Sequence, residues 1–179
     1  MATHPKTGWR RARSYAMKVS AQEEYGLRCL LQLAQAAQRG ESLTLAQIAE
    51  REGISVANAG KLLWILNKAG LVQSLRGTKG GYYLARPASE IHLNEIIRVL
   101  DADEVEAHCK SYTGVMDVCV HTSDCGIRSV IVNLHEIVQK ALSEITLAQL
   151  MGTEANVGEA LHQIEGLHQR QKQGTHQSA

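Results

Sequence analysis

Apolar residues recur at intervals of three and four near the start of this chain, and this spacing predicts three helices. The first covers residues 21 to about 38. The second, LAQIAEREG, follows Thr44, a residue type that caps helix N-termini, and stops at Gly53. Ser55 can cap the third helix, VANAGKLLWILNKAG, whose inward face is expected to comprise Val56, Ala59, Leu63 and Leu66.

The second and third helices are joined through a glycine turn, which is the pattern of a helix-turn-helix. After them the period of the sequence changes, and short β-type runs at 71–75 and 82–85 flank the segment RGTKGG. This arrangement predicts a β-hairpin with a basic, glycine-rich tip, called the wing. The expected fold class is therefore mainly α with a small β-hairpin wing, a winged helix-turn-helix domain.

Beyond the wing, residues 93–100 predict a short connecting helix. From Gly126 onward, apolar residues recur at intervals of 4, 3, 4, 3 and 4, a heptad-like seam on a helix expected to end near Met151. Such a helix could be buried against its own domain, but pairing with its twin in a homodimer is the favoured interpretation. The expected dimerisation residues are Ile127, Ile131, Leu134, Val138, Ala141 and Ile145.

These patterns divide the chain into six segments. Met17, where the patterned sequence begins, is a candidate for the native start. The segments are a basic leader expected to be disordered (1–16), the winged helix-turn-helix domain (17–90), a connecting helix and acidic break (91–108), a cysteine loop (109–125), the dimerisation helix (126–151) and a polar tail expected to be disordered (152–179).

Charge is spread unevenly along the chain. Residues 1–16 carry four bases and no acids, residues 17–89 nine bases and five acids, and residues 90–179 six bases and thirteen acids, which sum to +1. The basic front favours a polyanionic partner. No apolar run approaches the roughly 20 residues of a membrane span, and the N-terminus lacks the features of a secretory signal. We therefore expect a cytoplasmic protein without a membrane partner.

The third helix and the wing carry residue types that suit double-stranded DNA. The second helix of a helix-turn-helix enters the major groove, where Asn can pair with adenine and Lys with guanine or a phosphate. Glycines in the wing permit a close approach to the DNA backbone, and Arg76 is the first candidate for insertion into a groove. A dimer would match a palindromic operator, with recognition helices about 34 Å apart. A protein-docking module is the alternative. The expected DNA-binding residues are Ser55, Ala57, Asn58, Lys61, Arg76, Thr78, Lys79 and Gly80.

Three of the four cysteines lie in one segment, HCKSYTGVMDVCVHTSDCGIR, as Cys109, Cys119 and Cys125. In a reducing compartment, clustered cysteines indicate metal binding or redox chemistry, and thiolates are the usual ligands of iron–sulfur clusters. A structural Zn²⁺ completed by His121 or His108 and a thiol redox switch without metal are the alternatives. The fourth cysteine, Cys29, is expected to be buried as a small apolar residue.

The run KAGLVQSLRGTKGGYYLARP, joined to three cysteines, CGIR and a long helix, resembles the family of winged-helix regulators that contains IscR, NsrR and RirA. The resemblance covers about residues 17–151. It implies a homodimeric transcription regulator, not an enzyme, whose operator affinity is set by one iron–sulfur cluster per subunit, either [2Fe–2S] or [4Fe–4S]. Such a cluster would sense redox state, nitric oxide or iron, and the sequence leaves open whether the regulator is a repressor or an activator. No nucleotide-binding loop or catalytic constellation favours an enzyme.

The resemblance also bears on the fourth cluster ligand. The histidine that IscR uses is replaced here by Arg128, which cannot ligate. The carboxylate that NsrR uses, on the first helix of the partner subunit, corresponds to Glu24 when counted from Met17. His121, His108 and Asp124 are the competing candidates. The third helix departs from the family at Gly60, which costs about 1 kcal/mol relative to Ala and would be explained by close approach of DNA or another helix.

Overall fold

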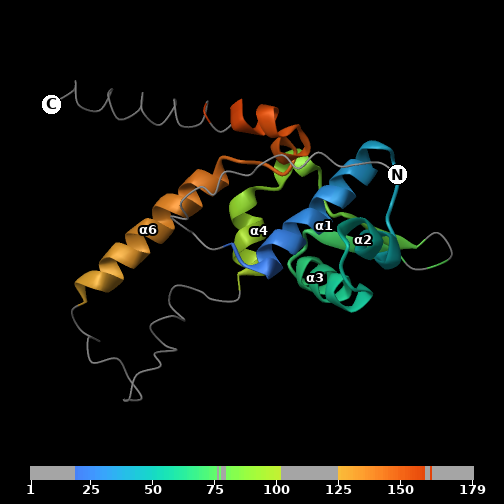
Figure 1. Ribbon diagram of the computed structural model, residues 1–179, viewed down its shortest axis with the longest axis horizontal. Coiled ribbons are helices and arrows are strands. Elements are labelled where there is room, and N and C mark those ends of the chain that lie inside the picture. The colour runs from blue at the N-terminus through green and yellow to red at the C-terminus, as the bar shows by residue number, and fades with distance from the viewer. Residues whose placement is uncertain (1–18, 76, 78–79, 102–124, 160–161, 163–179) are drawn as a thin grey trace, which may run out of the picture.

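The computed structural model describes residues 19–75, 77, 80–101, 125–159 and 162 of the 179-residue chain. In Figure 1, α1 runs through the centre of the molecule, and α6 extends away from the other helices. The elements in chain order are α1 (Ala21–Gln38), α2 (Leu45–Glu52), α3 (Val56–Lys68), β1 (Val72–Leu75), β2 (Gly81–Leu84), η1 (Ala88–Glu90), α4 (Leu93–Leu100), α6 (Gly126–Ser143) and η2 (Gln149–Met151).

Side-chain caps set where the first helices begin. Ser20 and Glu23 form a reciprocal capping box at α1, and Thr44 and Gln47 form another at α2. Ser55 caps α3. These caps supply partners to backbone N–H groups that a helix leaves unpaired at its start. The predictions that Thr44 and Ser55 are caps are therefore confirmed.

The helix-turn-helix is closed by a tight turn. Gly53 ends α2 with a φ of 64°, in the left-handed region that glycine adopts without steric cost. Its N–H donates to the carbonyls of the last turn of α2, and Ile54 N–H donates to Ala49 O at 3.0 Å. Only Ile54 and Ser55 then separate the turn from α3, so the two helices are packed against each other in the predicted arrangement.

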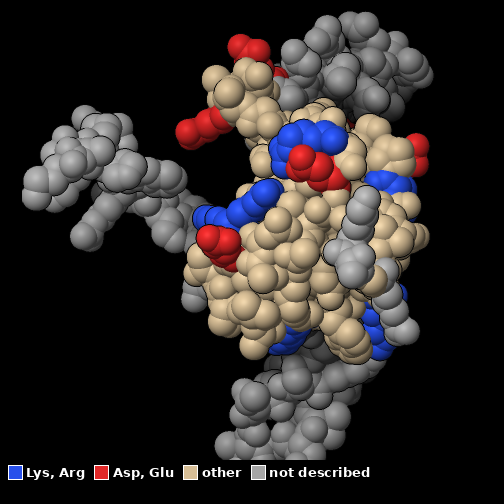
Figure 2. Space-filling view, turned by 90° about the vertical axis from the view of Figure 1, so that its right-hand side faces the viewer, with Lys and Arg blue, Asp and Glu red and all other residues tan. Residues whose placement is uncertain are grey.

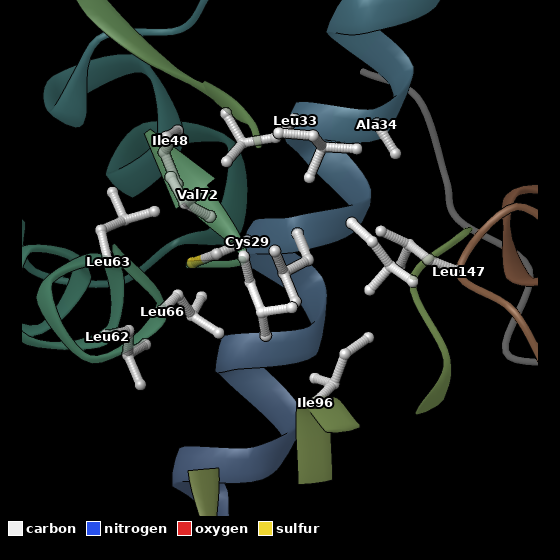
Figure 3. Packing of buried hydrophobic residues seen from close by; sticks show 14 of the residues in the cluster. Cys29, Leu33, Ala34, Ile48, Leu62, Leu63, Leu66, Val72, Ile96 and Leu147 are labelled. Atoms are coloured by element: carbon white, nitrogen blue, oxygen red, sulfur yellow. The ribbon is translucent and has the colours of Figure 1, made fainter. Parts of the chain in front are cut away.

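The core is built on α1. Figure 3 shows Cys29 and Leu33 of α1 pointing toward side chains of α2, α3 and β1, while Ile96 and Leu147 approach from the other side of the helix. The face that α3 buries comprises Ala59, Leu62, Leu63 and Leu66.

The prediction that Val56 belongs to this inward face is wrong. Val56 is the first residue of α3 and its side chain is 52% exposed. The first turn of α3 precedes the part of the helix that contacts the core, so local apolar spacing overestimated the length of the buried stripe.

The wing is a two-stranded antiparallel hairpin in which Val72 pairs with Leu84 and Leu75 with Gly81. Leu43, just before α2, forms a further bridge to Tyr82 through two backbone hydrogen bonds of 3.1 and 2.7 Å. A Cβ at Gly81 would lie 2.9 Å from Leu43 O, so this close pairing requires glycine. The base of the wing is thus fixed to the helix-turn-helix.

Helix α6 ends at Ser143, well before the expected Met151. The chain then turns back into the domain, where Leu93 N–H donates to Ile145 O and Leu147 N–H to Ile91 O, both at 2.8 Å. Ile145 and Leu147 are buried there. The expectation that Ile145 belongs to the dimerisation seam is therefore corrected, because this side chain fills the core of its own chain.

The polar tail begins with regular structure, since residues 154–159 are helical. Among the described residues, no helix is long and apolar enough to cross a membrane.

Two glycines inside helices differ in their surroundings. At Gly26 of α1, a Cβ would lie 2.5 and 2.6 Å from the two methyl carbons of Leu100, which is fully buried on α4. At Gly60 of α3, a Cβ would meet only Leu45 Cδ2, at an ordinary 3.6 Å. Close helix packing therefore requires glycine at Gly26 but does not account for Gly60.

We predict different effects of Gly26→Ala and Gly60→Ala on stability. Both gain about 1 kcal/mol of helix propensity, but overpacking against Leu100 costs about 1–3 kcal/mol. Gly60→Ala should raise the free energy of unfolding, and Gly26→Ala should leave it about 1–3 kcal/mol below that of Gly60→Ala. Urea unfolding monitored by circular dichroism measures the free energy of unfolding of both variants. Equal stability of the two variants would contradict the packing argument.

Candidate nucleic-acid interface and metal centre

The N-terminal end of α3 presents a small polar surface. Ser55, Ala57, Asn58 and Lys61 are all exposed. The Ser55 hydroxyl accepts a hydrogen bond from Asn58 N–H at 3.2 Å, which holds the first turn in place while the Asn58 side chain stays accessible. The structure therefore brings together the cap and the three residues of α3 that the sequence assigned to DNA.

The outward face of α3 continues beyond these residues. Trp64 is 63% exposed, and Lys68 Nζ lies 5.3 Å from the centre of its ring, in cation–π contact. Sequence reasoning missed Trp64. Its spacing of seven residues from Ala57 and three from Lys61, which places all of them on one face of a helix, was the signal that could have found it.

At the wing, Arg76, Thr78 and Lys79 lie outside the described residues, so their assignment to DNA stays a prediction. Gly80 is described. Its N–H donates to Gly77 O at 2.8 Å, and a Cβ at Gly80 would lie 2.6 Å from Leu75 O. Gly80 is thus required by the turn itself, which provides a structural reason for this glycine independent of DNA.

The end of the molecule that carries the hairpin is only sparsely charged. Figure 2 shows Lys and Arg side chains at separate places around a broad surface of uncharged residues, with a few acidic side chains beside them. Within α3 itself the charged residues are Lys61 and Lys68, and the helix has no Asp or Glu. A polyanion at α3 would therefore meet positive charge and no acidic residue of the helix itself.

Helix α6 carries a large uncovered apolar face. Although every residue of α6 is described, none is buried. Its half-buried residues include His135, Gln139 and Leu142, and the helix packs against α4. Large apolar side chains elsewhere on α6 are in solvent, including Ile127 at 71% exposure and Ile137 at 64%.

Most of the predicted seam lies on this face. Ile127, Ile131, Leu134 and Ala141 are exposed and Val138 is half-buried. Val130 and Ile137, which sequence reasoning missed, are also exposed. They are spaced seven residues apart and lie beside the predicted seam on the helix surface. An apolar stripe wider than two positions per heptad would have included them.

Of the predicted cluster ligands on the cysteine loop, the structure describes only Cys125. Cys109, Cys119 and the competing candidates His108, His121 and Asp124 lie outside the described residues. Cys125 is half-buried and is the N-cap of α6, where its Sγ accepts a hydrogen bond from Arg128 N–H at 3.4 Å. Its sulfur is therefore held in a fixed place at the N-terminal end of α6.

Glu24 lies in the first turn of α1 with about half of its side chain exposed. Its Oε1 is 2.6 Å from Arg28 Nη2, and Arg28 Nη1 lies 3.9 Å from Glu52 of α2. The carboxylate is therefore accessible from outside the chain, but it is already paired with a cation. Within the described part of the chain, no three metal-ligating side chains lie together.

Cys29 is separate from this site, as the sequence predicted. It is fully buried in the core, and burial, assisted by the negative charge of Glu52, raises its pKa to about 12. A thiol with this pKa stays protonated at neutral pH, which makes it a poor nucleophile and a poor metal ligand.

Comparisons with known proteins agree with this arrangement. A family model, Rrf2, described as an iron-dependent transcriptional regulator, matches residues 19–153. The HTH-type transcriptional regulator IscR of Serratia proteamaculans is 33% identical over 138 residues, which cover 77% of this chain and 81% of the relative.

Two solved structures share the fold. IscR of T. potens has a TM-score of 0.57 and 34% identity, covering 75% of this chain and 86% of that one. An oxidised form of CymR from Staphylococcus aureus has a TM-score of 0.56 and 30% identity, covering 76% and 98%. The chain belongs to the Rrf2 family and is a DNA-binding transcription regulator with a winged-helix fold.

Proposed function

We propose that the protein is a homodimer whose affinity for a palindromic operator depends on an iron–sulfur cluster, and that it acts in the cytoplasm as a regulator without enzymatic activity. The observation that carries the proposal is the position of Cys125. This candidate ligand is the cap of α6, the helix that presents the uncovered apolar face. A cluster bound there would lie at the start of the dimer interface.

The apolar face of α6 supports the dimer. Contiguous exposed apolar side chains are unfavourable in water and mark surfaces that another molecule covers. A second copy of α6 carries the same face and can cover it symmetrically. A two-fold axis at α6 would present two copies of α3 to successive turns of the duplex, about 34 Å apart.

The connections of α6 supply a route from the cluster to the DNA. The segment that follows α6 hydrogen-bonds to Ile91 and Leu93, at the start of α4, and α4 packs on both α1 and α3. A shift of α6 would therefore be transmitted to the spacing of the two recognition helices. Because operator binding depends on that spacing, the state of the cluster and the affinity for DNA are coupled.

The residues on this chain suit the cluster by their chemistry. Cys109, Cys119 and Cys125 would hold it through thiolates, and Glu24 of the partner subunit would provide the fourth ligand. When bound, the cluster supplies redox chemistry that the protein side chains lack. A carboxylate is a hard ligand and binds iron less firmly than a thiolate does, so Glu24 would be the exchangeable position.

A thiol redox switch is the second candidate, because CymR of Staphylococcus aureus, a structural neighbour, was solved in an oxidised form. A zinc-stabilised regulator and a protein-docking module are the remaining alternatives. Metal analysis separates the cluster from zinc and from free thiols.

The first prediction from this proposal concerns DNA binding. The DNA duplexes for this test are selected by the full chain from a random-sequence library. The logarithm of their binding constant should fall linearly with the logarithm of the salt concentration, because phosphate contacts release counterions. Arg76→Ala should weaken binding by roughly 1–3 kcal/mol. Arg98→Ala, which removes an exposed positive charge on α4, is the matched control and should bind like the wild type. Equal affinity of all three proteins in fluorescence anisotropy would refute the role of the wing.

The second prediction concerns the metal. Protein purified without oxygen should contain iron and sulfide, absorb in the visible range, and lose both elements in Cys125→Ala. Glu24→Ala should alter the spectrum or shorten the lifetime of the cluster. Glu41→Ala is the control, because Glu41 is also half exposed and pairs with an arginine, Arg39, at 2.9 Å.

Colourless protein with one zinc per chain would exclude the cluster. An unchanged spectrum and lifetime in Glu24→Ala would assign the fourth position to another residue.

The third prediction concerns the dimer. Leu134→Lys places a charge in the apolar face of α6 and should convert the protein to monomers in sedimentation velocity. Glu136→Lys introduces the same side chain at an exposed position two residues away on the same helix and should leave the dimer intact. Dimers in both variants would show that another surface holds the subunits together.

A further inference from the structure

We propose that Trp64 is a DNA-contacting residue whose indole N–H donates to a phosphate oxygen at the edge of the major groove, with Lys68 beside the same phosphate. This inference rests on the DNA-binding function of α3 and adds to it a contact that lies beyond the N-terminal reading residues.

The geometry of α3 determines which way Trp64 points. The buried residues Ala59, Leu62, Leu63 and Leu66 define the core side of the helix. With about 100° of rotation per residue, the opposite side is occupied by positions 57, 61, 64 and 68, at intervals of four, three and four. All four of these residues are exposed. Trp64 therefore shares its face with Ala57 and Lys61, two of the predicted DNA-binding residues.

The exposed Trp64 side chain is suited to contact another molecule. A tryptophan typically buries 150–250 Å² when it is covered, and a buried indole N–H finds a hydrogen-bond acceptor. Here the ring is 63% exposed and its neighbour is the Lys68 ammonium, 5.3 Å from the ring centre. Trp64 is thus a large amphipathic group that its own chain leaves open.

The chemistry around Trp64 selects phosphate as that partner. The indole N–H can only donate, and a phosphate oxygen can only accept. Lys61 and Lys68 lie on the same face, and α3 carries no acidic residue. An anion with acceptor oxygens fits this surface, and the anion that α3 meets is the DNA backbone.

The length of the helix places the contact at the groove edge. Trp64 is seven residues beyond Ala57, which corresponds to about 10 Å along the helix axis. The major groove of B-DNA is about 12 Å wide. When the first turn of α3 reaches the bases, Trp64 is near the phosphates that border the groove, and Lys68 is one turn further along. The cation–π contact with Lys68 then orients the ring beside the backbone.

This role has a signature that a purely structural tryptophan lacks. A phosphate contact carries no base information, so Trp64→Phe should weaken binding to the selected duplex and to an unrelated duplex by the same factor, about ten-fold. Asn58→Ala, at a base-reading position, should weaken only the selected duplex. Because indole is neutral, Trp64→Phe should leave the salt slope unchanged, whereas Lys68→Met should reduce it by about one.

The experiment uses the fluorescence of Trp64 itself. The chain has two tryptophans, so in a Trp9→Phe background the emission reports on Trp64 alone. Titration of this full-length protein with the selected duplex should shift or quench the emission, and added salt should reverse the change. The thermal midpoint of Trp64→Phe should equal that of the wild type, because the side chain is outside the core.

Three results would overturn the proposal. Emission that stays constant while anisotropy shows saturation with the duplex would place Trp64 away from DNA. Unchanged affinity of Trp64→Phe for both duplexes would show that the indole makes no useful contact. If the Trp9→Phe protein and the wild type both bind no duplex, DNA binding by α3 is refuted and the inference fails with it. This result differs from normal duplex binding without a change in Trp64 emission.

Discussion

Helix α1 is the constraint on which the rest of the structure depends, because five other elements of the domain pack against it. It contacts α2 and α3 on the side of the helix-turn-helix, β2 of the wing, and α4 and η2 on the side that leads to α6. Gly26 lets Leu100 of α4 approach α1 closely. The face of α3 and the uncovered face of α6 are therefore connected through α4, which packs on α6 and on both α1 and α3.

The two exposed surfaces of the molecule differ in the partner that each can accept. The face of α6 is apolar and extends over several turns, so a matching apolar surface is what removes it from water. The face of α3 combines two lysines, an amide and an indole, and these groups need an acceptor-rich anion. The same kind of observation, exposure of large side chains, thus leads to a protein partner in one place and to a phosphate backbone in the other.

Local features of the structure could be predicted from the sequence, whereas features that depend on distant contacts could not. Thr44, Ser55 and Gly53 act within a few residues of themselves, so their roles as caps and turn were readable. The end of α6 at Ser143 depends on the backbone hydrogen bonds that the following segment makes with Ile91 and Leu93, some fifty residues earlier in the chain, and nothing near Ser143 signals it.

The candidate site follows the same rule. The exposed residues at the start of α3 could be assigned from position and residue type, because the first turn of a recognition helix is defined by its cap. Trp64 was missed because tryptophan is an apolar residue, although its spacing from Ala57 and Lys61 places it on their face, and the packed structure shows that it points away from the core. The position of Cys125 as the cap of α6 joins two predicted sites that the sequence treated as separate segments.

The ion pair between Glu24 and Arg28 bears on whether Glu24 could serve as a ligand. Both side chains are about half exposed, and an exposed ion pair at this spacing on a helix contributes only about 0.3–0.5 kcal/mol. A carboxylate that enters a metal's coordination shell would lose little by leaving Arg28. Arg28 would keep Glu52, 3.9 Å away, as an alternative partner, so its charge would not be left uncompensated. The pairing seen in the structure is therefore compatible with an exchangeable ligand, since a deeply buried ion pair in its place would have opposed the exchange.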